Sequence, residues 1–272
     1  MRHVSGRSWL FFIFMSLLGV LPVQAELILS SAPRDSKEKE EDIYKPIAEL
    51  LTKAAGEKVT FRYGDNFLVY QSEMRKGNYD IVLDGPAFVS WRMVKLGHVP
   101  LVKFPGNLVF VAIAKSSQDK IKTLKDLGGR TVCAFPPPNL ATLTVLYEFD
   151  NPARQPLIIE VQNFADAYKG VKSGKCVGGI LQAKLYQDLD KEAKAAKVLF
   201  TSKPLPNQAF SAGPRLTAEK RERVVQALLS AEGAAATQKL REVYKAQTLL
   251  PATVEEFQGL NKLLRDIWGF ET

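Results

Sequence analysis

The chain has 272 residues, of which 46% are hydrophobic and 24% charged, and its formal net charge is +8. This composition is typical of an ordinary folded protein, and the length permits one large domain or two smaller ones. A basic excess can indicate a nucleic acid partner. Here, however, Lys and Arg are interspersed with Asp and Glu, and aromatic residues do not alternate with them as a base-stacking surface requires. We therefore expect no nucleic acid partner.

The first 25 residues have the three parts of a secretory signal peptide. Arg2 and Arg7 precede a short apolar run at residues 9–20, and Val23-Gln24-Ala25 has the pattern of a cleavage site. The apolar run is shorter than the roughly 20 residues that a membrane-spanning helix needs. We predict cleavage after Ala25 and export to the periplasm.

Residues 26–113 contain short apolar runs that alternate with helical patterns. The β-α order repeats three times, which predicts a parallel sheet with right-handed crossovers. Pro46 lies inside the first helical pattern, so we expect the helix to be kinked or split there. In chain order we predict a strand at 26–30, a helix at 37–55, a strand at 59–63, a helix at 67–76, a strand at 81–83, a helix at 86–96, and strands at 101–104 and 108–115.

A second β-α series follows, and the chain ends in helical patterns. The predicted helices of this series lie at 121–127, 140–149, 165–172 and 183–196, and its strands at 130–135, 157–161, 176–181 and 198–200. An extended piece at 209–212 leads into helices at 217–230, 234–244 and 254–267. The order predicts an α/β protein with two lobes, residues 26–113 plus 206–272 and the inserted residues 114–205. Two connections between lobes make a hinge, and ligands bind in such clefts.

The strongest signal for a binding site is the stretch NYDIVLDGPAFVSW. Its buried strand ends at Asp84, and a helical pattern that includes Phe88 follows. Ligands bind at the carboxyl ends of strands in open α/β sheets, so we expect Asp84, Gly85 and Phe88 at the cleft. Alternatively, Asp84 only caps the helix. A carboxylate repels a fully ionised oxyanion, so Asp84 at the cleft would favour a protonated oxyanion, a hydroxyl or an amine.

A helix start in the inserted lobe is predicted to face the same cleft. Asn139 is a good N-cap, and the first turn, with Ala141 and Thr142, offers free backbone N–H groups to an anion. The alternative is an ordinary capped helix after a proline-rich turn. Other polar residues that follow predicted strands or lie on the return segment are further candidates for ligand binding: Ser31, Tyr63, Gln182 and Gln208. Arg34 also follows a strand, but a surface loop is the simpler interpretation.

Little in the sequence indicates catalysis. After the predicted signal peptide there is one histidine, His98, and we find neither a Ser-His-carboxylate set nor a cluster with metal-ligand spacing. We expect no enzyme activity, no metal and no cofactor. Cys133 and Cys176 are the two cysteines, each in or beside a predicted strand. A disulfide and a pair of buried thiols both remain open.

Three segments resemble, in their order, the periplasmic phosphate/phosphite/phosphonate-binding proteins: LVYQSEMRKGNYDIVLDGP, LKDLGGRTVCAFPPPNLAT and KPLPNQAFSAGP. The resemblance implies a type II periplasmic-binding-protein fold, in which the lobes close on a small ligand that passes to an inner-membrane ABC permease. We also expect a monomer. At the position of the family's Ser-Thr-Ser run, the sequence reads Pro138-Asn139-Leu140-Ala141-Thr142. The ligand is then either a phosphonate-like oxyanion or a compound without phosphorus. A partner of a membrane sensor is the alternative to a transport receptor.

Overall fold

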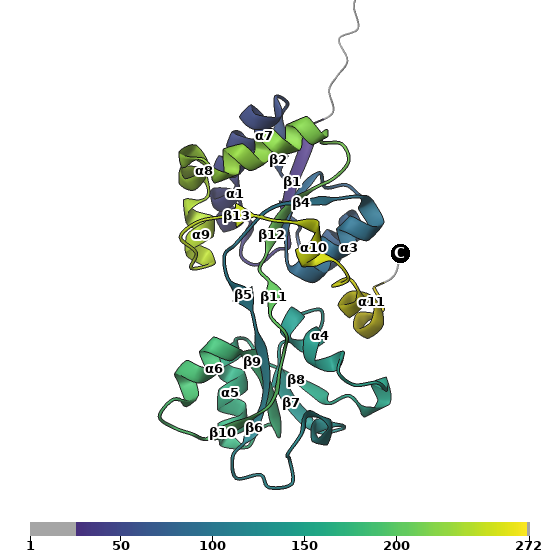
Figure 1. The fold of residues 1–272 in the computed structure, drawn as a ribbon, viewed down its shortest axis with the longest axis vertical. Helices are drawn as coiled ribbons and strands as arrows, with labels where there is room; N and C mark the ends of the chain where they lie inside the picture. Colours follow the sequence, from purple (N-terminus) through teal and green to yellow (C-terminus); the bar gives the residue numbers. More distant parts are fainter. Residues whose placement is uncertain (1–25, 271–272) are drawn as a thin grey trace, which may run out of the picture.

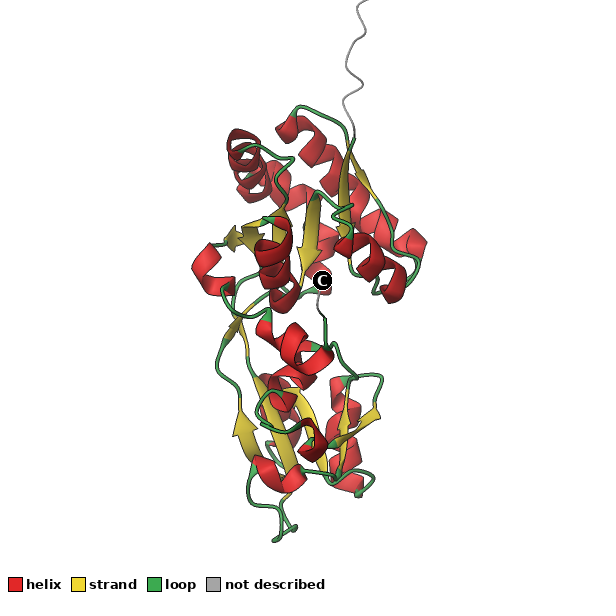
Figure 2. Cartoon of the chain, turned by 90° about the vertical axis from the view of Figure 1, so that its right-hand side faces the viewer, coloured by secondary structure: helices red, strands yellow, loops and turns green. Residues whose placement is uncertain are grey.

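A computed structural model describes residues 26–270 and shows two α/β lobes joined end to end by a narrow connection (Figure 1). Each lobe has its own sheet, and helices lie on both sides of the strands (Figure 2). The predicted α/β, two-lobed architecture is confirmed. The predicted signal peptide lies outside the described residues. Within residues 26–270, no helix is long and apolar enough to span a membrane.

The first lobe has a mixed, six-stranded sheet in the order β13-β4-β12-β3-β1-β2. β1 pairs in parallel with β2 and β3, as the β-α order predicts. The returning strand β12 enters between β3 and β4 and runs antiparallel to both, so the late part of the chain completes the lobe. The strands are β1 (Leu27–Ser31), β2 (Val59–Phe61), β3 (Ile81–Asp84), β4 (Val99–Lys103), β12 (Ala209–Ala212) and β13 (Leu250–Pro251).

Helices cover both faces of this sheet. On one face, α1 (Lys37–Ala55) and α7 (Ala218–Leu229) contribute to a core with β1, β3, β4 and β12. On the other, α2 (Phe67–Arg75), α3 (Pro86–Leu96) and α11 (Lys262–Trp268) pack together. α1 continues through Pro46 as one helix, so the proline does not split it. The carbonyl that loses its donor belongs to the exposed Asp42, where water can replace the missing N–H.

The two last predicted helices are each interrupted. The first divides into α8 (Ala231–Ala236) and α9 (Gln238–Val243) at Thr237, whose hydroxyl donates to the carbonyl of Gly233 at 2.7 Å. The second divides into α10 (Val254–Phe257) and α11 around Gly259, which has a φ of 80°. That left-handed backbone ends a helix, and glycine adopts it without steric cost.

The second lobe has a five-stranded sheet in the order β10-β6-β9-β7-β8, with β7, β8 and β9 parallel. Its α4 shares a core with one face, and α5 and α6 pack on the other. α4 is shorter than the predicted helix at 140–149. The strands are β6 (Phe110–Lys115), β7 (Thr131–Ala134), β8 (Leu157–Glu160), β9 (Gly178–Gln182) and β10 (Ala196–Thr201), and the helices α4 (Leu140–Leu146), α5 (Phe164–Ser173) and α6 (Ala183–Asp190), with 3₁₀ turns at Leu124–Leu127 and Pro152–Arg154.

The chain crosses between the lobes twice, through β5 (Asn107–Leu108) and β11 (Leu205–Pro206), which pair antiparallel. β6 belongs to the second sheet along its length, and the predicted boundary after residue 113 falls inside it. The lobes also touch where α4 packs against α11. Leu143 of α4 is fully buried there in a cluster with Leu263 and Leu264 of α11. The hinge strands and this apolar contact together set the angle between the lobes.

Cys133 and Cys176 form a disulfide in the second lobe, with their Cα atoms 5.7 Å apart. Cys133 lies in β7 and Cys176 shortly before β9, the parallel neighbour of β7. The interior of α5 passes directly over the bond at Gly170. A Cβ atom at Gly170 would lie 2.5 Å from the sulfur of Cys133. The helix can approach the disulfide this closely only with glycine at that position.

We expect Gly170→Ala to lower the free energy of unfolding by about 1–3 kcal/mol through overpacking. In an ordinary helix interior the same change would raise it by about 1 kcal/mol. In the Cys133→Ala/Cys176→Ala background the clash is gone, and the substitution should be neutral or stabilising. Urea denaturation of the four proteins measures this. Equal costs in both backgrounds would rule out the disulfide as the cause.

His98 is buried between α3 and β4, with 5% of its surface exposed. Its Nδ1 lies 3.2 Å from the hydroxyl of Ser211. Burial, and then the positive charge of Arg92, lowers the pKa of His98 from 6.5 to about 3. The folded protein therefore keeps this imidazole neutral over the pH range in which the unfolded chain protonates it.

This histidine should make the protein acid-sensitive. Because the unfolded chain binds the proton first, the contribution of His98 to stability is complete above about pH 6.5 and is lost as the pH falls toward about 3. The expected slope is up to about 1.4 kcal/mol per pH unit. Urea denaturation between about pH 7.5 and 4.5 should show a flatter dependence for His98→Gln than for the wild type. Parallel curves for the two proteins would contradict this origin of the acid sensitivity.

Candidate functional site

A cleft of about 710 Å³ lies between the lobes, and strand ends from both sheets meet there. In the first lobe, the residues after β1 and β3 and those before the antiparallel β12 line it. In the second lobe, the ends of β7, β8 and β9 and the start of β6 do so. The lining comprises Ala32, Pro33, Arg34, Phe67, Asp84, Gly85, Pro86, Ala87, Phe88, Leu108, Phe110, Phe135, Pro136, Pro137, Pro138, Asn139, Leu140, Glu160, Phe164, Gln182 and Gln208. This is the edge at which open α/β sheets bind ligands.

Asp84 belongs to the cleft lining, but its carboxylate is bound from inside the first lobe. Its side chain is 1% exposed, and its carboxylate accepts hydrogen bonds from the Tyr70 hydroxyl and from Arg92 Nε, both at 2.6 Å. Arg92 also donates to the Tyr70 oxygen at 3.0 Å. The N-cap of α3 is Gly85, so Asp84 is not the cap. The helix-cap alternative is therefore wrong. Asp84 is among the residues that line the cleft, but Arg92, from the second turn of α3, reaches back and neutralises its carboxylate.

Burial shapes the charges of this network. Burial first, and then the charge of Asp84, raises the pKa of the Tyr70 hydroxyl well above its usual value of 10. Burial lowers the pKa of Arg92, but the interactions with Tyr70 and Asp84 have the larger combined effect, so the Arg92 pKa is raised above its usual value. Tyr70 is thus a neutral donor, and Arg92 stays a cation. Toward the cleft, the charge of Asp84 is compensated.

The start of α3 offers backbone donors to the cleft. Pro86 has no N–H, and the N–H groups of Ala87 and Phe88 have no acceptor within residues 26–270. At Gly85, no atom lies within 4 Å of where a Cβ would be. The positive end of an eleven-residue helix is therefore open at this wall, which favours a negatively charged or carbonyl oxygen.

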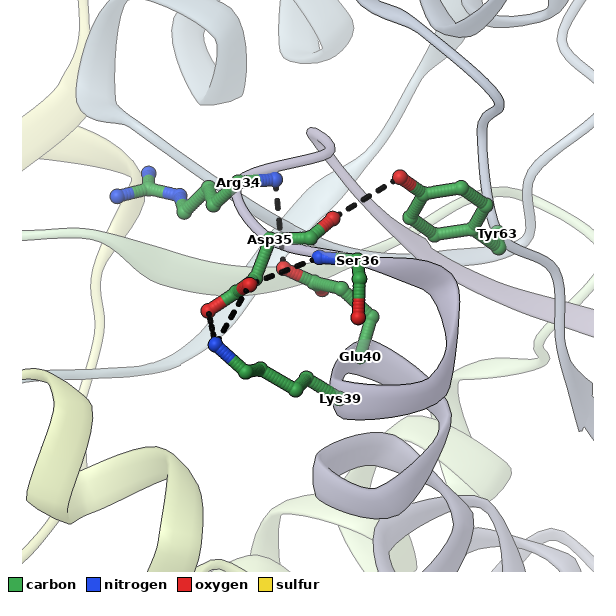
Figure 3. Close-up of polar contacts among 6 residues, drawn as sticks. All are labelled: Arg34, Asp35, Ser36, Lys39, Glu40 and Tyr63. Atoms are coloured by element: carbon green, nitrogen blue, oxygen red, sulfur yellow. Dashed lines mark hydrogen bonds and ion pairs between the residues drawn. The ribbon is translucent and has the colours of Figure 1, made fainter.

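Arg34 brings a cation to the cleft from the loop after β1. Its guanidinium carbon lies 5.2 Å from the centre of the Tyr244 ring, and its side chain has no carboxylate partner in the described part of the chain. Figure 3 shows it pointing away from Asp35, Lys39 and Glu40. The Glu40 carboxylate accepts from the Arg34 backbone N–H at 3.3 Å instead. Arg34 is thus an exposed loop residue, as the simpler interpretation has it, and it also lines the cleft.

Aromatic side chains form much of both walls. In the first lobe, Phe67 and Phe88 meet edge to face with ring centres 5.9 Å apart. In the second, Phe135 and Phe164 are perpendicular at 4.9 Å. Such geometry is favourable for aromatic rings and holds each pair in a fixed orientation. Prolines at 33, 86 and 136–138 stiffen the same surface.

Amide side chains supply the remaining polar groups. Gln208, just before β12, has a buried Oε1 without a hydrogen-bond partner within residues 26–270. Gln182 ends β9 and is exposed to the cleft. Asn139 also lines it, but its side-chain oxygen accepts from the Ala141 N–H at 3.0 Å. The orphan oxygen of Gln208 makes this residue the clearest hydrogen-bonding position available to a ligand.

Four predicted contacts do not line the cleft. Ser31 donates to Glu40 at 3.2 Å, and Tyr63 donates to the Asp35 carbonyl at 2.9 Å. Thr142 is fully buried and donates to the Phe135 carbonyl at 2.5 Å. The Ala141 N–H is used by Asn139. Two of the donors expected to bind an anion at this helix start, the Ala141 N–H and the Thr142 hydroxyl, therefore have internal partners. The candidates Asp84, Gly85, Phe88, Asn139, Gln182 and Gln208 do line the cleft.

The sequence interpretation missed the aromatic wall and Glu160. Phe135 and Glu160 stand at the ends of two predicted strands, so the rule that selected Gln182 applies to them equally. Within residues 26–270, no group of three or more His, Cys, Asp and Glu side chains is placed to hold a metal ion.

Two α/β lobes, a double crossing and a cleft at the strand ends define a type II periplasmic binding protein. Residues 29–257 match the family described as ABC transporter, phosphonate, periplasmic substrate-binding protein. The chain belongs to this family and is a solute-binding receptor of an ABC importer. The family is periplasmic and works with a membrane permease. No curated protein matches the chain in sequence.

Solved structures share the fold at low sequence identity. XAC2383 of Xanthomonas citri, bound to ATP, has a TM-score of 0.68 at 13% identity, with 91% of this chain and 99% of that chain covered. PhnD1 of Prochlorococcus marinus, in complex with methylphosphonate, has a TM-score of 0.62 at 10% identity, with 89% of this chain and 98% of that chain covered. A binding protein component of a Pseudomonas aeruginosa ABC phosphonate transporter has a TM-score of 0.60 at 12% identity, with 89% of this chain and 86% of that chain covered.

Proposed function

We propose that this receptor captures its ligand between the lobes by closing about β5 and β11, and then presents the closed form to an inner-membrane ABC permease. The observation that carries the proposal is the convergence of strand ends from both sheets on one cleft beside a two-stranded hinge. Closure of two lobes around a ligand is a known hinge motion. It would bring together groups that belong to different lobes.

The ligand contacts that we propose come from both walls. The first lobe supplies Arg34, Gln208 and the backbone at Gly85 and Phe88, and the second supplies Gln182. We further propose that the chain is exported, cleaved after Ala25 and monomeric. It would act without catalysis, cofactor or nucleic acid. An orphan amide oxygen and free helix N–H groups suit binding, whereas nothing in the cleft pairs a nucleophile with a base.

Ligand binding should raise the melting temperature and draw the lobes together. A thermal-shift panel would include phosphate, phosphite, methylphosphonate, amines and small organic acids, because a ligand at a hundredfold excess over its Kd stabilises by about 2.7 kcal/mol. Small-angle scattering with each hit should show a smaller radius of gyration.

The matched variants are Gln182→Ala, in the cleft, and Gln187→Ala, an exposed glutamine of α6 outside it. We expect only the first to weaken binding, by up to about tenfold for the loss of one hydrogen bond. A ligand that binds without compaction, and equally to both variants, would show that the cleft is not the site.

A further inference from the structure

We propose that the cleft selects an organic ligand with one negative charge and a flat apolar body, rather than a small dianionic oxyanion. Arg34 would bind the anionic group, and the two phenylalanine pairs would hold the body. This inference rests on the proposed receptor function and narrows its ligand class.

The charges in the cleft suit a single negative charge. Asp84, Arg34 and Glu160 are the charged residues of the lining, and Asp84 is paired with Arg92 at 2.6 Å. Arg34 is then the one cation among the described lining residues, and its side chain forms no ion pair with a carboxylate. Glu160 has no ion pair or hydrogen bond through its side chain in residues 26–270, and it would repel a multiply charged anion. One guanidinium and the start of α3 can balance one negative charge.

Arg34 is already held in position. The guanidinium lies over the Tyr244 ring, and that ring stacks on Phe104 at 4.2 Å between centres. A guanidinium stacked on an aromatic face keeps its N–H edge free for a planar acid such as a carboxylate. The residue is therefore prepared for an anion without first breaking a salt bridge.

The walls favour a flat apolar body. Phe67 with Phe88 and Phe135 with Phe164 come from opposite lobes and line one cleft with five prolines. Small-molecule sites with such walls gain affinity from buried apolar surface, and aromatic faces suit planar groups. A bare dianion gains nothing from these surfaces and loses its hydration on entering.

Four probes separate charge from shape. Phenylacetate has the ring and one negative charge, phenylacetamide has the ring alone, acetate has the charge alone, and methylphosphonate is a small oxyanion. Calorimetry with the full mature chain should rank phenylacetate first, by at least about tenfold over phenylacetamide and acetate, the value of one charge-assisted contact. Binding of methylphosphonate as tight as that of phenylacetate, or no binding of phenylacetate, overturns the inference.

Two variants assign the contacts. Arg34→Gln should lower phenylacetate affinity to the level of phenylacetamide and leave phenylacetamide unchanged. Arg62→Gln, at an exposed arginine of the same lobe outside the cleft, should change neither. Phe135→Leu should weaken both ring compounds and not acetate. Unchanged phenylacetate binding by Arg34→Gln also overturns the inference.

The outcome separates this inference from the receptor function. If methylphosphonate binds best, compacts the protein and loses affinity in Gln182→Ala, the receptor function stands and the ligand class proposed here is wrong. If phenylacetate binds without compaction and Gln182→Ala and Gln187→Ala bind it equally, the receptor function fails as well.

Discussion

Replacing Arg92 with methionine should lower the free energy of unfolding by about 3–5 kcal/mol, the usual cost of breaking a buried ion pair. Arg92 and Asp84 are 0% and 1% exposed and 2.6 Å apart. Without the guanidinium, Asp84 keeps only the hydrogen bond from Tyr70, and an uncompensated carboxylate lies in the core of the first lobe. Urea denaturation followed by the fluorescence of the neighbouring Trp91 measures the loss.

A second substitution tests the cause. Asp84→Asn in the Arg92→Met background removes the stranded charge, so the double variant should be more stable than Arg92→Met alone. Arg92 Nη1 is itself buried without a partner within residues 26–270, so the native pair is not ideally satisfied. This makes the recovery easier, because replacement of both ions in a buried pair is often nearly neutral. Additive losses from the two substitutions would show that the charges do not depend on each other.

Removing the disulfide should lower the free energy of unfolding by about 4 kcal/mol, because the unfolded chain gains conformational entropy. Cys133 and Cys176 are 43 residues apart, and the loss grows with the logarithm of the loop that the bond closes. The Cys133→Ala/Cys176→Ala variant, in urea, gives the value. Reduction of the wild type should lower its midpoint by a similar amount and leave the midpoint of the variant unchanged.

The site of this loss can be observed separately. Trp91 and Trp268 lie in α3 and α11 of the first lobe, whereas backbone circular dichroism follows both lobes. If the second lobe is weakened alone, the dichroism of the double variant should change at lower urea than its tryptophan fluorescence. Coincident transitions, with an unchanged midpoint, would show that the bond does not stabilise the second lobe.

The sequence alone predicted the order of elements and the strand ends that meet at the cleft. The run at residues 81–83 followed by Gly85-Pro86 marked the end of β3, and the same rule selected Gln182. Gln208 was selected because it lies on the return segment. Arg34 was judged a surface residue because a loop arginine has no local pattern that separates it from a ligand contact. Its contact with the Tyr244 ring depends on a residue 210 positions later in the chain, a separation that no local pattern spans.

The sequence by itself determined the two α/β lobes, because strand and helix periods and turn residues act over a few neighbouring residues. The receptor family was indicated by the resemblance of three segments, and the family match over residues 29–257 shows the membership. Only the tertiary structure decided which polar groups remain free for a ligand. Arg92 donates a hydrogen bond to the Asp84 carboxylate, and the Thr142 hydroxyl donates to the Phe135 carbonyl. The side-chain oxygen of Gln208 and the guanidinium of Arg34 have no such partners in the described residues. Each pairing depends on side chains brought together by packing, so the chemistry of the cleft is set by what the folded core leaves unpaired.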